Sequence, residues 1–450
     1  MKKLWLIFFF IPILLVKAQF LKPEDIISGP MLGQVELRTA SVWLEVSPEV
    51  RSVALIYWKE GHPETLRQRN YEGQLGREFN PVRIDIGGLD INTRYEYQFI
   101  INQVKSSATG YLLTKDLWQW RKAAPDFSFL TGSCAYFNEP IYDRPGKPYG
   151  GDSVIFEAMA RDSAAFTLWL GDNWYTREVD LQSKWGLWYR ASRDRAQPVL
   201  KNLLKAMPQY AIWDDHDFGP DNSGTSYGLN DVSREIFLKY WGNPFYGEDQ
   251  KGIYSQISYS DVDLFLTDDR YFRSADELED SVNGNPNPEK HFFGANQLTW
   301  LEDALVQSLA TFKIIVVGSQ ALNPLSTDEG LYNYSFEYHK LMDFLNRSKI
   351  KGVLFLTGDR HHSEIVKTAR LGNYDLYDIT VSPFTSGVAK VRGDEINNPA
   401  RVPGSLVEQR NYARLSVRGK KNEREFLVQF NGQDGKPLYN WSISEQQLTR

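Results

Sequence analysis

The chain has 450 residues, of which 42% are hydrophobic and 24% charged, so it is an ordinary folded protein of two or three domains and not a disordered or fibrous chain. Its formal net charge is −6, and it becomes −9 without residues 1–18, which hold three lysines and no acidic residue (48 basic against 57 acidic residues). An acidic chain of this kind is not expected to bind nucleic acid except as a substrate.

Residues 1–18 have the features of a cleaved secretory signal peptide. Lys2 and Lys3 precede an apolar run from Leu4 to Val16, and Val16-Lys17-Ala18 provides a small-residue cleavage site after Ala18. The run is too short to span a bilayer, so no stable membrane span is expected, although an uncleaved interfacial anchor is an alternative. No twin arginine precedes it. We therefore expect a secreted or periplasmic protein exported by the general secretory route.

The composition includes a single cysteine, Cys134. In an oxidising compartment it has no intramolecular disulfide partner. It must therefore be buried and inert, paired with another chain, or used as a ligand or nucleophile.

From residue 26 to residue 116 the sequence predicts short antiparallel strands. The segments are VELRTASVWLEV, VALIYWKEG, VRIDIGGL and YEYQFIIN, separated by turn residues. Apolar and polar side chains alternate in them as half-buried strands require. The corner between Ile86 and Tyr97 resembles a fibronectin type III-like domain, in which a tyrosine packs the sandwich. We therefore expect residues 26–116 to form a β-sandwich, a domain type that usually binds or spaces.

Residues 126–450 follow a different pattern, in which apolar strands alternate with helical segments. The strand segments are FSFLTGSCA, FTLWLGDNWY, QYAIWDDHD, DLFLTDDR, FKIIVVGSQ and GVLFLTGDRHH. Because they are short and almost entirely apolar, they are typical of buried central strands in an α/β fold. Helical spacing is found at Asp152–Arg161, Leu181–Met207 and Asn296–Leu309, with a break expected at Pro198.

Two further segments of this part have their own character. The stretch from Phe272 to Phe292 is polar and rich in Asn and Pro, which predicts a loop. From Asn411 onward, YARLSV, REFLVQF and LYNWSIS predict a terminal meander with a turn at Asn431-Gly432.

Polar side chains that can bind metals follow four of the predicted strands. They are Cys134, Asp172 with Tyr175, the cluster Asp214 to Asp217 with His216, and the cluster Asp359 to His362. Taken singly, these residues could be turn formers, packed aromatics, a small buried thiol or a calcium loop. Together, at the strand ends of one domain, they favour a metal centre.

The order of these motifs resembles the calcineurin-like metallophosphoesterases, and among them the alkaline phosphatase D (PhoD-like) family. In that branch a Cys replaces the first ligand motif, a Tyr follows the Asp of GD by three residues, and DDH and GDxH replace GNH and GHxH. Here these are Cys134, Asp172 with Tyr175, Asp215-His216 and Asp359-Arg360-His361. The resemblance implies an α/β fold with a metallophosphoesterase-type β-sandwich flanked by helices, beside the smaller all-β N-terminal domain.

The resemblance also implies a ligand set. Cys134, Asp172, Tyr175 and His361 would bind Fe³⁺, and Asp172 would bridge to Ca²⁺ held by Asp215, Asn222 and Asp359. Thiolate and phenolate are anionic donors suited to a trivalent ion, and oxygen donors suit a hard divalent ion. Zn²⁺ or Mn²⁺ are alternatives. Asn222 is carried over on its spacing alone.

The reaction implied is hydrolysis of a phosphate ester by metal-bound hydroxide at a dinuclear or multinuclear site. His216 would act beside the leaving oxygen as general acid or electrostatic stabiliser. Arg360 would contact the substrate phosphate, or form a structural ion pair. The substrate could be a small molecule or a polymer, and neither monoesters nor diesters are favoured.

Two features depart from the family pattern. Members are often exported by the twin-arginine route with metal already loaded, whereas residues 1–18 of this chain lack the arginine pair. The family pattern also includes a middle histidine, and here Gln320 stands near its place. The alternative function is a non-catalytic surface binding protein stabilised by calcium. A nucleotide-dependent kinase or ATPase is not expected, because the chain lacks a GxxxxGKS or GxxxxGKT loop.

Overall fold

The computed structural model describes residues 25–247, 250–325 and 329–449. The expected signal peptide, residues 1–18, lies outside these ranges. Within them, no helix is long and apolar enough to cross a bilayer.

The N-terminal part is a β-sandwich of a three-stranded and a four-stranded sheet, with orders β1-β2-β5 and β4-β3-β6-β7. Its strands are β1 (Ile26–Val35), β2 (Thr39–Val46), β3 (Val53–Lys59), β4 (His62–Asn70), β5 (Asn80–Gly87), β6 (Arg94–Ile101) and β7 (Val104–Leu113). Alternate residues of β6 are buried, as the sequence predicts. The hydroxyl of Tyr95 accepts a hydrogen bond from the backbone nitrogen of Asp90 at 2.9 Å, which fixes the corner before β6 as in fibronectin-like sandwiches.

The second part contains two six-stranded sheets. The first has the order β10-β9-β8-β19-β20-β21. It is made of β8 (Phe127–Gly132), β9 (Thr167–Leu170), β10 (Gln209–Ile212), β19 (Asn411–Arg418), β20 (Glu425–Gly432) and β21 (Pro437–Ser444). The parallel strands β8, β9 and β10 are short and buried, while the terminal meander joins the sheet antiparallel to β8.

The second sheet has the order β11-β12-β15-β16-β18-β17. Its strands are β11 (Ser255–Tyr259), β12 (Val262–Leu266), β15 (Phe312–Val317), β16 (Val353–Thr357), β17 (Glu364–Thr368) and β18 (Leu376–Thr380). The parallel strands β12, β15 and β16 are buried throughout, in agreement with their continuous apolar runs.

Helices connect and cover these sheets. They are α1 (Val154–Ala160), α2 (Lys184–Arg195), α3 (Leu200–Ala206), α4 (Asp215–Phe218), α5 (Asn230–Tyr240), α6 (Ala295–Gln307) and α7 (Ser335–Ser348), with 3₁₀ turns η2 (Leu331–Asn333), η3 (Gly393–Asn397) and η4 (Glu445–Leu448). Pro198 lies between α2 and α3, so the break predicted there is confirmed.

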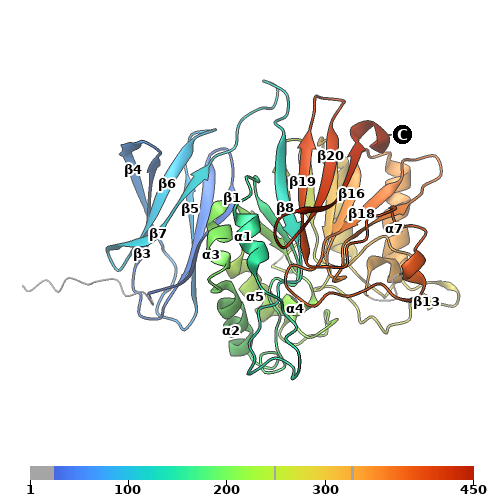
Figure 1. The fold of residues 1–450 in the computed structure, drawn as a ribbon, viewed down its shortest axis with the longest axis horizontal. Coiled ribbons are helices and arrows are strands. Elements are labelled where there is room, and N and C mark those ends of the chain that lie inside the picture. Colours follow the sequence, from blue (N-terminus) through green and yellow to red (C-terminus); the bar gives the residue numbers. More distant parts are fainter. Residues whose placement is uncertain (1–24, 248–249, 326–328, 450) are drawn as a thin grey trace, which may run out of the picture.

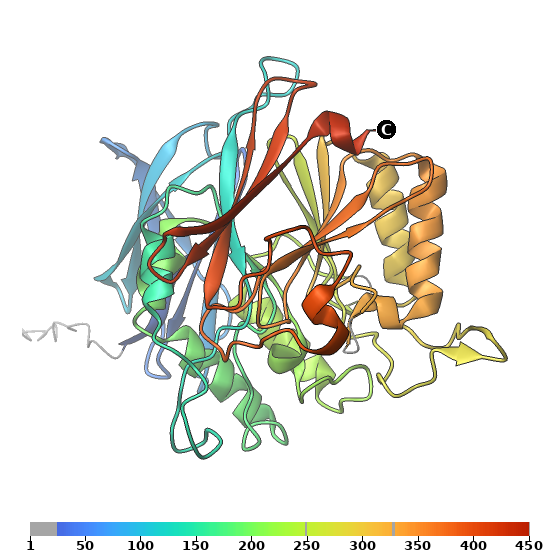
Figure 2. The ribbon, with the colours of Figure 1, turned by 45° about the vertical axis from the view of Figure 1, so that its right-hand side comes forward.

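The layers follow the chain across the molecule. Figure 1 shows the N-terminal sandwich, then the green helices α1 to α5, then the two sheets, then the helices of the far side. After the turn in Figure 2, α6 and α7 lie side by side on the outer face of the second sheet. The sheets contact each other through aromatic side chains such as Phe312 and Phe426, whose ring centroids are 5.5 Å apart. The expected α/β class, with a helix-flanked sandwich and a smaller all-β domain, is confirmed.

Some elements were not predicted. The polar edge strand β4 is almost wholly exposed, so it lacks the alternation that signals a strand. The predicted loop from Phe272 to Phe292 includes a small hairpin of β13 (Ser281–Val282) and β14 (Asn285–Pro286). Helices α5 and α7 were also missed, although each buries one face.

Candidate metal centre

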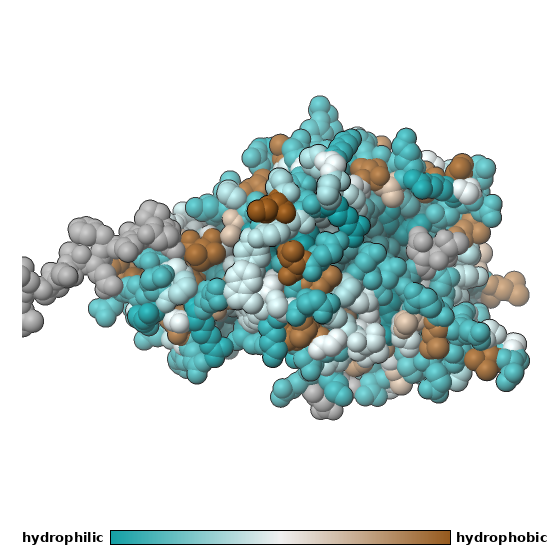
Figure 3. Space-filling view, turned by 90° about the horizontal axis from the view of Figure 1, so that it is seen from below, coloured by the Kyte–Doolittle hydropathy of each residue, from teal (hydrophilic) through white to brown (hydrophobic). Residues whose placement is uncertain are grey.

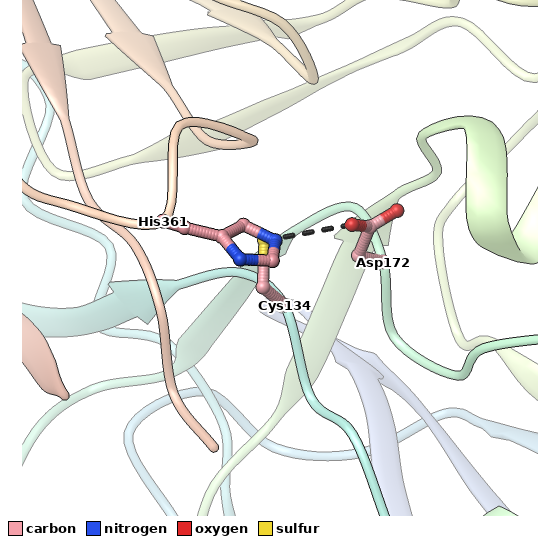
Figure 4. Close-up of side chains that lie close together, drawn as sticks. All are labelled: Cys134, Asp172 and His361. Carbon is pink, nitrogen blue, oxygen red and sulfur yellow. Dashed lines mark hydrogen bonds between the residues drawn. The ribbon is translucent and has the colours of Figure 1, made fainter. Parts of the chain in front are cut away.

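Three potential ligands meet where strand ends of the two sheets converge. Cys134 follows β8, Asp172 follows β9 and His361 follows β16, and their ligand atoms lie within 4.8 Å of one another. Figure 4 shows the three side chains pointing toward a common point. Since β8 and β9 are parallel neighbours and β16 belongs to the other sheet, the packing of the two sheets creates this group.

Tyr175 completes the group. Its hydroxyl donates to Asp172 Oδ2 at 2.8 Å and lies 3.2 Å from His361 Nε2. Cys134 Sγ is 3.5 Å from the same Asp172 oxygen. Cys134, Asp172 and Tyr175 are at most 3% exposed, and His361 is half-buried. The structure thus brings together all four residues expected to hold the trivalent ion.

A second group shares one member with the first. Ligand atoms of Asp172, Asp215 and His216 lie within 4.8 Å of one another, so the Asp172 carboxylate stands between the two groups. Asp215 Oδ2 accepts a hydrogen bond from the backbone nitrogen of Asn222 at 2.9 Å. Asp359 belongs to neither group, but its carbonyl oxygen is 3.6 Å from Cys134 Sγ. Metal binding by the Asn222 and Asp359 side chains stays a prediction.

His216 lies at the solvent side of the centre. The backbone nitrogen of His216 donates to Asp172 Oδ1 at 3.2 Å, and its ring centroid is 4.1 Å from that of Tyr175. The side chain is 24% exposed, and Nε2 is 3.5 Å from Asp221 Oδ1. Asp214 and Asp217 form a capping box that fixes the start of α4, and so the backbone of Asp215 and His216.

Two other predicted residues point elsewhere. Arg360 is buried, and its Nη2 donates to both carboxylate oxygens of Glu395, at 2.7 and 2.8 Å. Its contact with substrate phosphate stays a prediction. Gln320, near the place of the missing histidine, donates to Glu364 Oε1 and Thr380 Oγ1, each at 2.9 Å. It is thereby held in a buried polar network on the second sheet.

The titratable groups of the centre disfavour one another's charged forms. Burial raises the pKa of the Cys134 thiol to about 12, and burial with the nearby Asp215 carboxylate raises the pKa of Asp172 well above its ordinary value. Burial also raises the pKa of Tyr175 and brings that of Asp359 to about 6. A bound cation would reverse this balance, because it stabilises thiolate, phenolate and carboxylate together. The donor set therefore fits a metal centre.

The backbone at these strand ends is unusual. Five of the predicted ligands adopt positive φ angles: Cys134 at 62°, Asp172 at 53°, Asp359 at 69° and His361 at 56° after strands, and Asn222 at 57°. Such conformations cost free energy in non-glycine residues and cluster at functional sites. Gly171, at φ 99°, has no room for a side chain, because a Cβ would lie 2.6 Å from Asp214 Cβ. The strands are thus bent sharply where they deliver their ligands.

Several residues around the centre were missed by the sequence analysis. Ser382 donates to Cys134 Sγ at 3.2 Å, and Tyr149 Oη is 3.0 Å from His361 Nδ1. Arg270 is fully buried and pairs with Asp214 and Glu329. Ser382 and Tyr149 lie in irregular segments that carry no periodic signal, whereas Arg270 follows a predicted strand in the sequence TDDR. Only Arg270 offered a usable signal.

The face toward which α2 and α4 lie is seen in Figure 3. It is mainly hydrophilic, with hydrophobic side chains scattered over it. No large apolar patch dominates this view of the described surface.

Comparison with known proteins gives a consistent result. A family model described as PhoD-like phosphatase matches residues 129–430. Alkaline phosphatase D of Bacillus subtilis (strain 168) is 22% identical over 333 residues, which cover 63% of this chain and 53% of that protein. The chain therefore matches about half the length of this curated relative.

Two solved structures share the fold. A structure of PhoD superposes with a TM-score of 0.76 at 16% identity, covering 96% of this chain and 92% of the other. A purple acid phosphatase from yellow lupin (Lupinus luteus) seeds gives a TM-score of 0.66 at 11% identity, covering 92% of this chain and 74% of the other.

Proposed function

The chain belongs to the PhoD-like phosphatase family, and on that premise we propose that it hydrolyses phosphate esters at the metal centre described above. The observation that carries the proposal is the convergence of thiol, phenol, carboxylate and imidazole on one buried point. A calcium site has no chemical use for a thiol. The donor set therefore favours an enzyme over a calcium-stabilised binding protein.

We propose that Cys134, Asp172, Tyr175 and His361 hold Fe³⁺, and that Asp172, Asp215, Asn222 and Asp359 hold Ca²⁺, with Zn²⁺ or Mn²⁺ as alternatives. Cations bound there would neutralise charge on the phosphoryl oxygens and lower the pKa of water. Asp172 is the natural bridge, because its two oxygens face different neighbours: Oδ2 faces Tyr175 and Oδ1 faces the backbone of His216.

His216 acts on the leaving group in this proposal. Burial lowers the pKa of His216, while the neighbouring Asp215 and Asp221 carboxylates favour its protonated form. A proton held at Nε2, 3.5 Å from Asp221, lies on the solvent side of the centre. From there it can be transferred to a departing alkoxide. The Tyr175 ring packs against the His216 ring at an interplanar angle of 33° and so restricts its orientation.

Substitution of the buried donors tests the proposal. Cys134→Ala and Tyr175→Phe should each reduce the amount of bound iron. Each should also lower the rate of hydrolysis of an aryl phosphate by about 100-fold or more, as expected for the loss of a metal ligand. Tyr175→Phe should also remove visible absorption due to phenolate-to-iron charge transfer. Tyr142→Phe, which changes a tyrosine 40% exposed on a nearby loop, is the control. Full activity in Cys134→Ala would refute the assignment.

Wild-type protein that contains calcium but no transition metal, and cleaves neither aryl mono- nor diesters, would instead support the binding-protein alternative. Parallel kinetics on an aryl monoester and a bis-aryl diester would define the substrate class.

We further propose that the chain is exported, with cleavage after Ala18, and that residues 26–116 and 126–450 are its two domains. N-terminal sequencing of the mature protein tests the cleavage site. Limited proteolysis within residues 117–125 tests the domain division.

A further inference from the structure

Tyr149 contacts the candidate ligand His361 from the side away from the other donors. Its hydroxyl oxygen is 3.0 Å from His361 Nδ1, whereas His361 Nε2 faces Tyr175 at 3.2 Å. The two nitrogens of the imidazole are therefore engaged in opposite directions. A histidine that binds metal through Nε2 must carry its proton on Nδ1, and the partner of Nδ1 fixes that tautomer.

The ring of Tyr149 is held firmly for a residue that is 44% exposed. It packs edge-to-face on Tyr136, with centroids 4.9 Å apart, and a Cβ on Gly387 would lie only 2.5 Å from Tyr149 Cε2. The absence of a side chain at Gly387 is thus what leaves space for the ring.

The backbone next to Tyr149 is also fixed. The carbonyl of Gly150 accepts from the Asn138 side chain at 2.9 Å, and the nitrogen of Gly150 donates to it at 3.0 Å. The nitrogen of Gly151 donates to the carbonyl of Thr385 at 2.7 Å. These bonds fasten the end of the loop to the segment that follows β18. The position of the hydroxyl is therefore set by the fold on both sides.

The hydroxyl oxygen of Tyr149 is suited to accept a hydrogen bond from Nδ1. A phenol hydroxyl can accept one hydrogen bond and donate another. Its oxygen can accept the Nδ1 hydrogen while its own hydrogen remains free to donate. Two other groups lie near the imidazole: Ser386 Oγ is 3.5 Å from Nδ1, and the backbone of Gly387 also contacts the ring.

We propose that Tyr149 is a positioning residue that accepts a hydrogen bond from His361 Nδ1 and thereby keeps Nε2 available to the metal. The inference rests on the proposed function for its effect on catalysis, but the tautomer of His361 does not depend on any activity.

Three measurements on Tyr149→Phe, with Tyr142→Phe as the matched control, test the inference. In metal-free protein labelled with ¹⁵N-histidine, wild-type His361, assigned by its loss in His361→Gln, should show the Nδ1-protonated tautomer. Tyr149→Phe should shift it toward a mixture. Tyr149→Phe should lose metal to a chelator about 10- to 100-fold faster and reduce kcat with little change in KM. Tyr142→Phe should change none of these.

Gly387→Ala provides a second test in which the hydroxyl is kept but the ring is displaced. It should reproduce the tautomer shift and the faster loss of metal. An Nε2-protonated His361 in the wild type, or a tautomer and metal release unchanged in Tyr149→Phe, would overturn the inference. If the wild type has no phosphatase activity but the tautomer changes as expected, the proposed function fails and the positioning role stands.

Discussion

Glu45 offers a quantitative test of how the N-terminal sandwich is joined to the rest of the protein. It lies on β2, is 1% exposed, and its Oε1 accepts hydrogen bonds from Ser192 Oγ at 2.8 Å and Tyr240 Oη at 2.9 Å. These partners belong to α2 and α5, in the second part of the chain. Burial raises the pKa of Glu45 from 4.5 to about 7, although Ser192, Tyr240 and Arg195 oppose the rise.

The direction in which stability changes with pH follows from proton binding. Between pH 4.5 and 7 the folded protein keeps a proton that the unfolded chain releases, so this group's contribution to stability falls as the pH rises through that window. One pKa unit corresponds to about 1.4 kcal/mol, and ionised Glu45 therefore costs the fold about 3 kcal/mol above pH 7. About 2.5 kcal/mol of this change falls between pH 5 and pH 8.

Glu45→Gln keeps the shape of the side chain and removes the ionisation. We expect the free energy of unfolding of Glu45→Gln to rise relative to wild type by about 2.5 kcal/mol between pH 5 and pH 8, measured by urea unfolding under identical metal conditions. Other titrating groups cancel in this comparison. Glu72→Gln, at a side chain that is 76% exposed, should show no such change. An equal difference between variant and wild type at both pH values would mean that Glu45 is ionised in the fold, and the reasoning would be wrong.

Three further predictions concern the metal centre. Gly171→Ala should lower the thermal midpoint of unfolding far more than Gly284→Ala. Both glycines have positive φ, but of the two only Gly171 lacks space for a Cβ, so equal losses would contradict the prediction. Arg270→Met leaves the buried Asp214 carboxylate without its partner and should cost about 3–5 kcal/mol in urea unfolding, with a neutral result counting against the ion pair. Protein freed of metal by a chelator should have a lower free energy of unfolding at pH 8 than at pH 5. Burial raises the pKa of Asp359 to about 6, so above pH 6 its carboxylate ionises among other anions. Metal-loaded protein should show a smaller decrease.

The features that the sequence predicts best are the buried strands, which have continuous apolar runs, and the candidate ligands that follow them. Buried parallel strands such as β9 and β15 consist of continuous apolar residues, and each candidate ligand follows such a run directly. Parallel strands end at one edge of a sheet, so the convergence of Cys134 and Asp172 could be expected. Pro198 marked a helix break by its missing backbone donor.

The rest depends on contacts between distant segments. Strand β4 forms because it pairs with β3, and its own residues are polar and exposed. Tyr149 meets His361 across 212 positions, and Ser382 meets Cys134 across 248. The periodicity of hydrophobic residues within a segment does not predict contacts between residues so far apart in the sequence. The direction of Arg360 was equally undetermined, because its partner Glu395 lies 35 residues further along the chain, in η3.

One feature of the first sheet bears on the order in which the protein folds. Strand β19 is inserted between β8, which leads into Cys134, and β20. Until residues 411–418 have been synthesised, one edge of β8 is unpaired. The segment that leads into Cys134 is therefore paired on both sides only after β19 has joined β8. We expect a chain that ends before residue 411 to expose this edge of β8 and to associate with other chains through it.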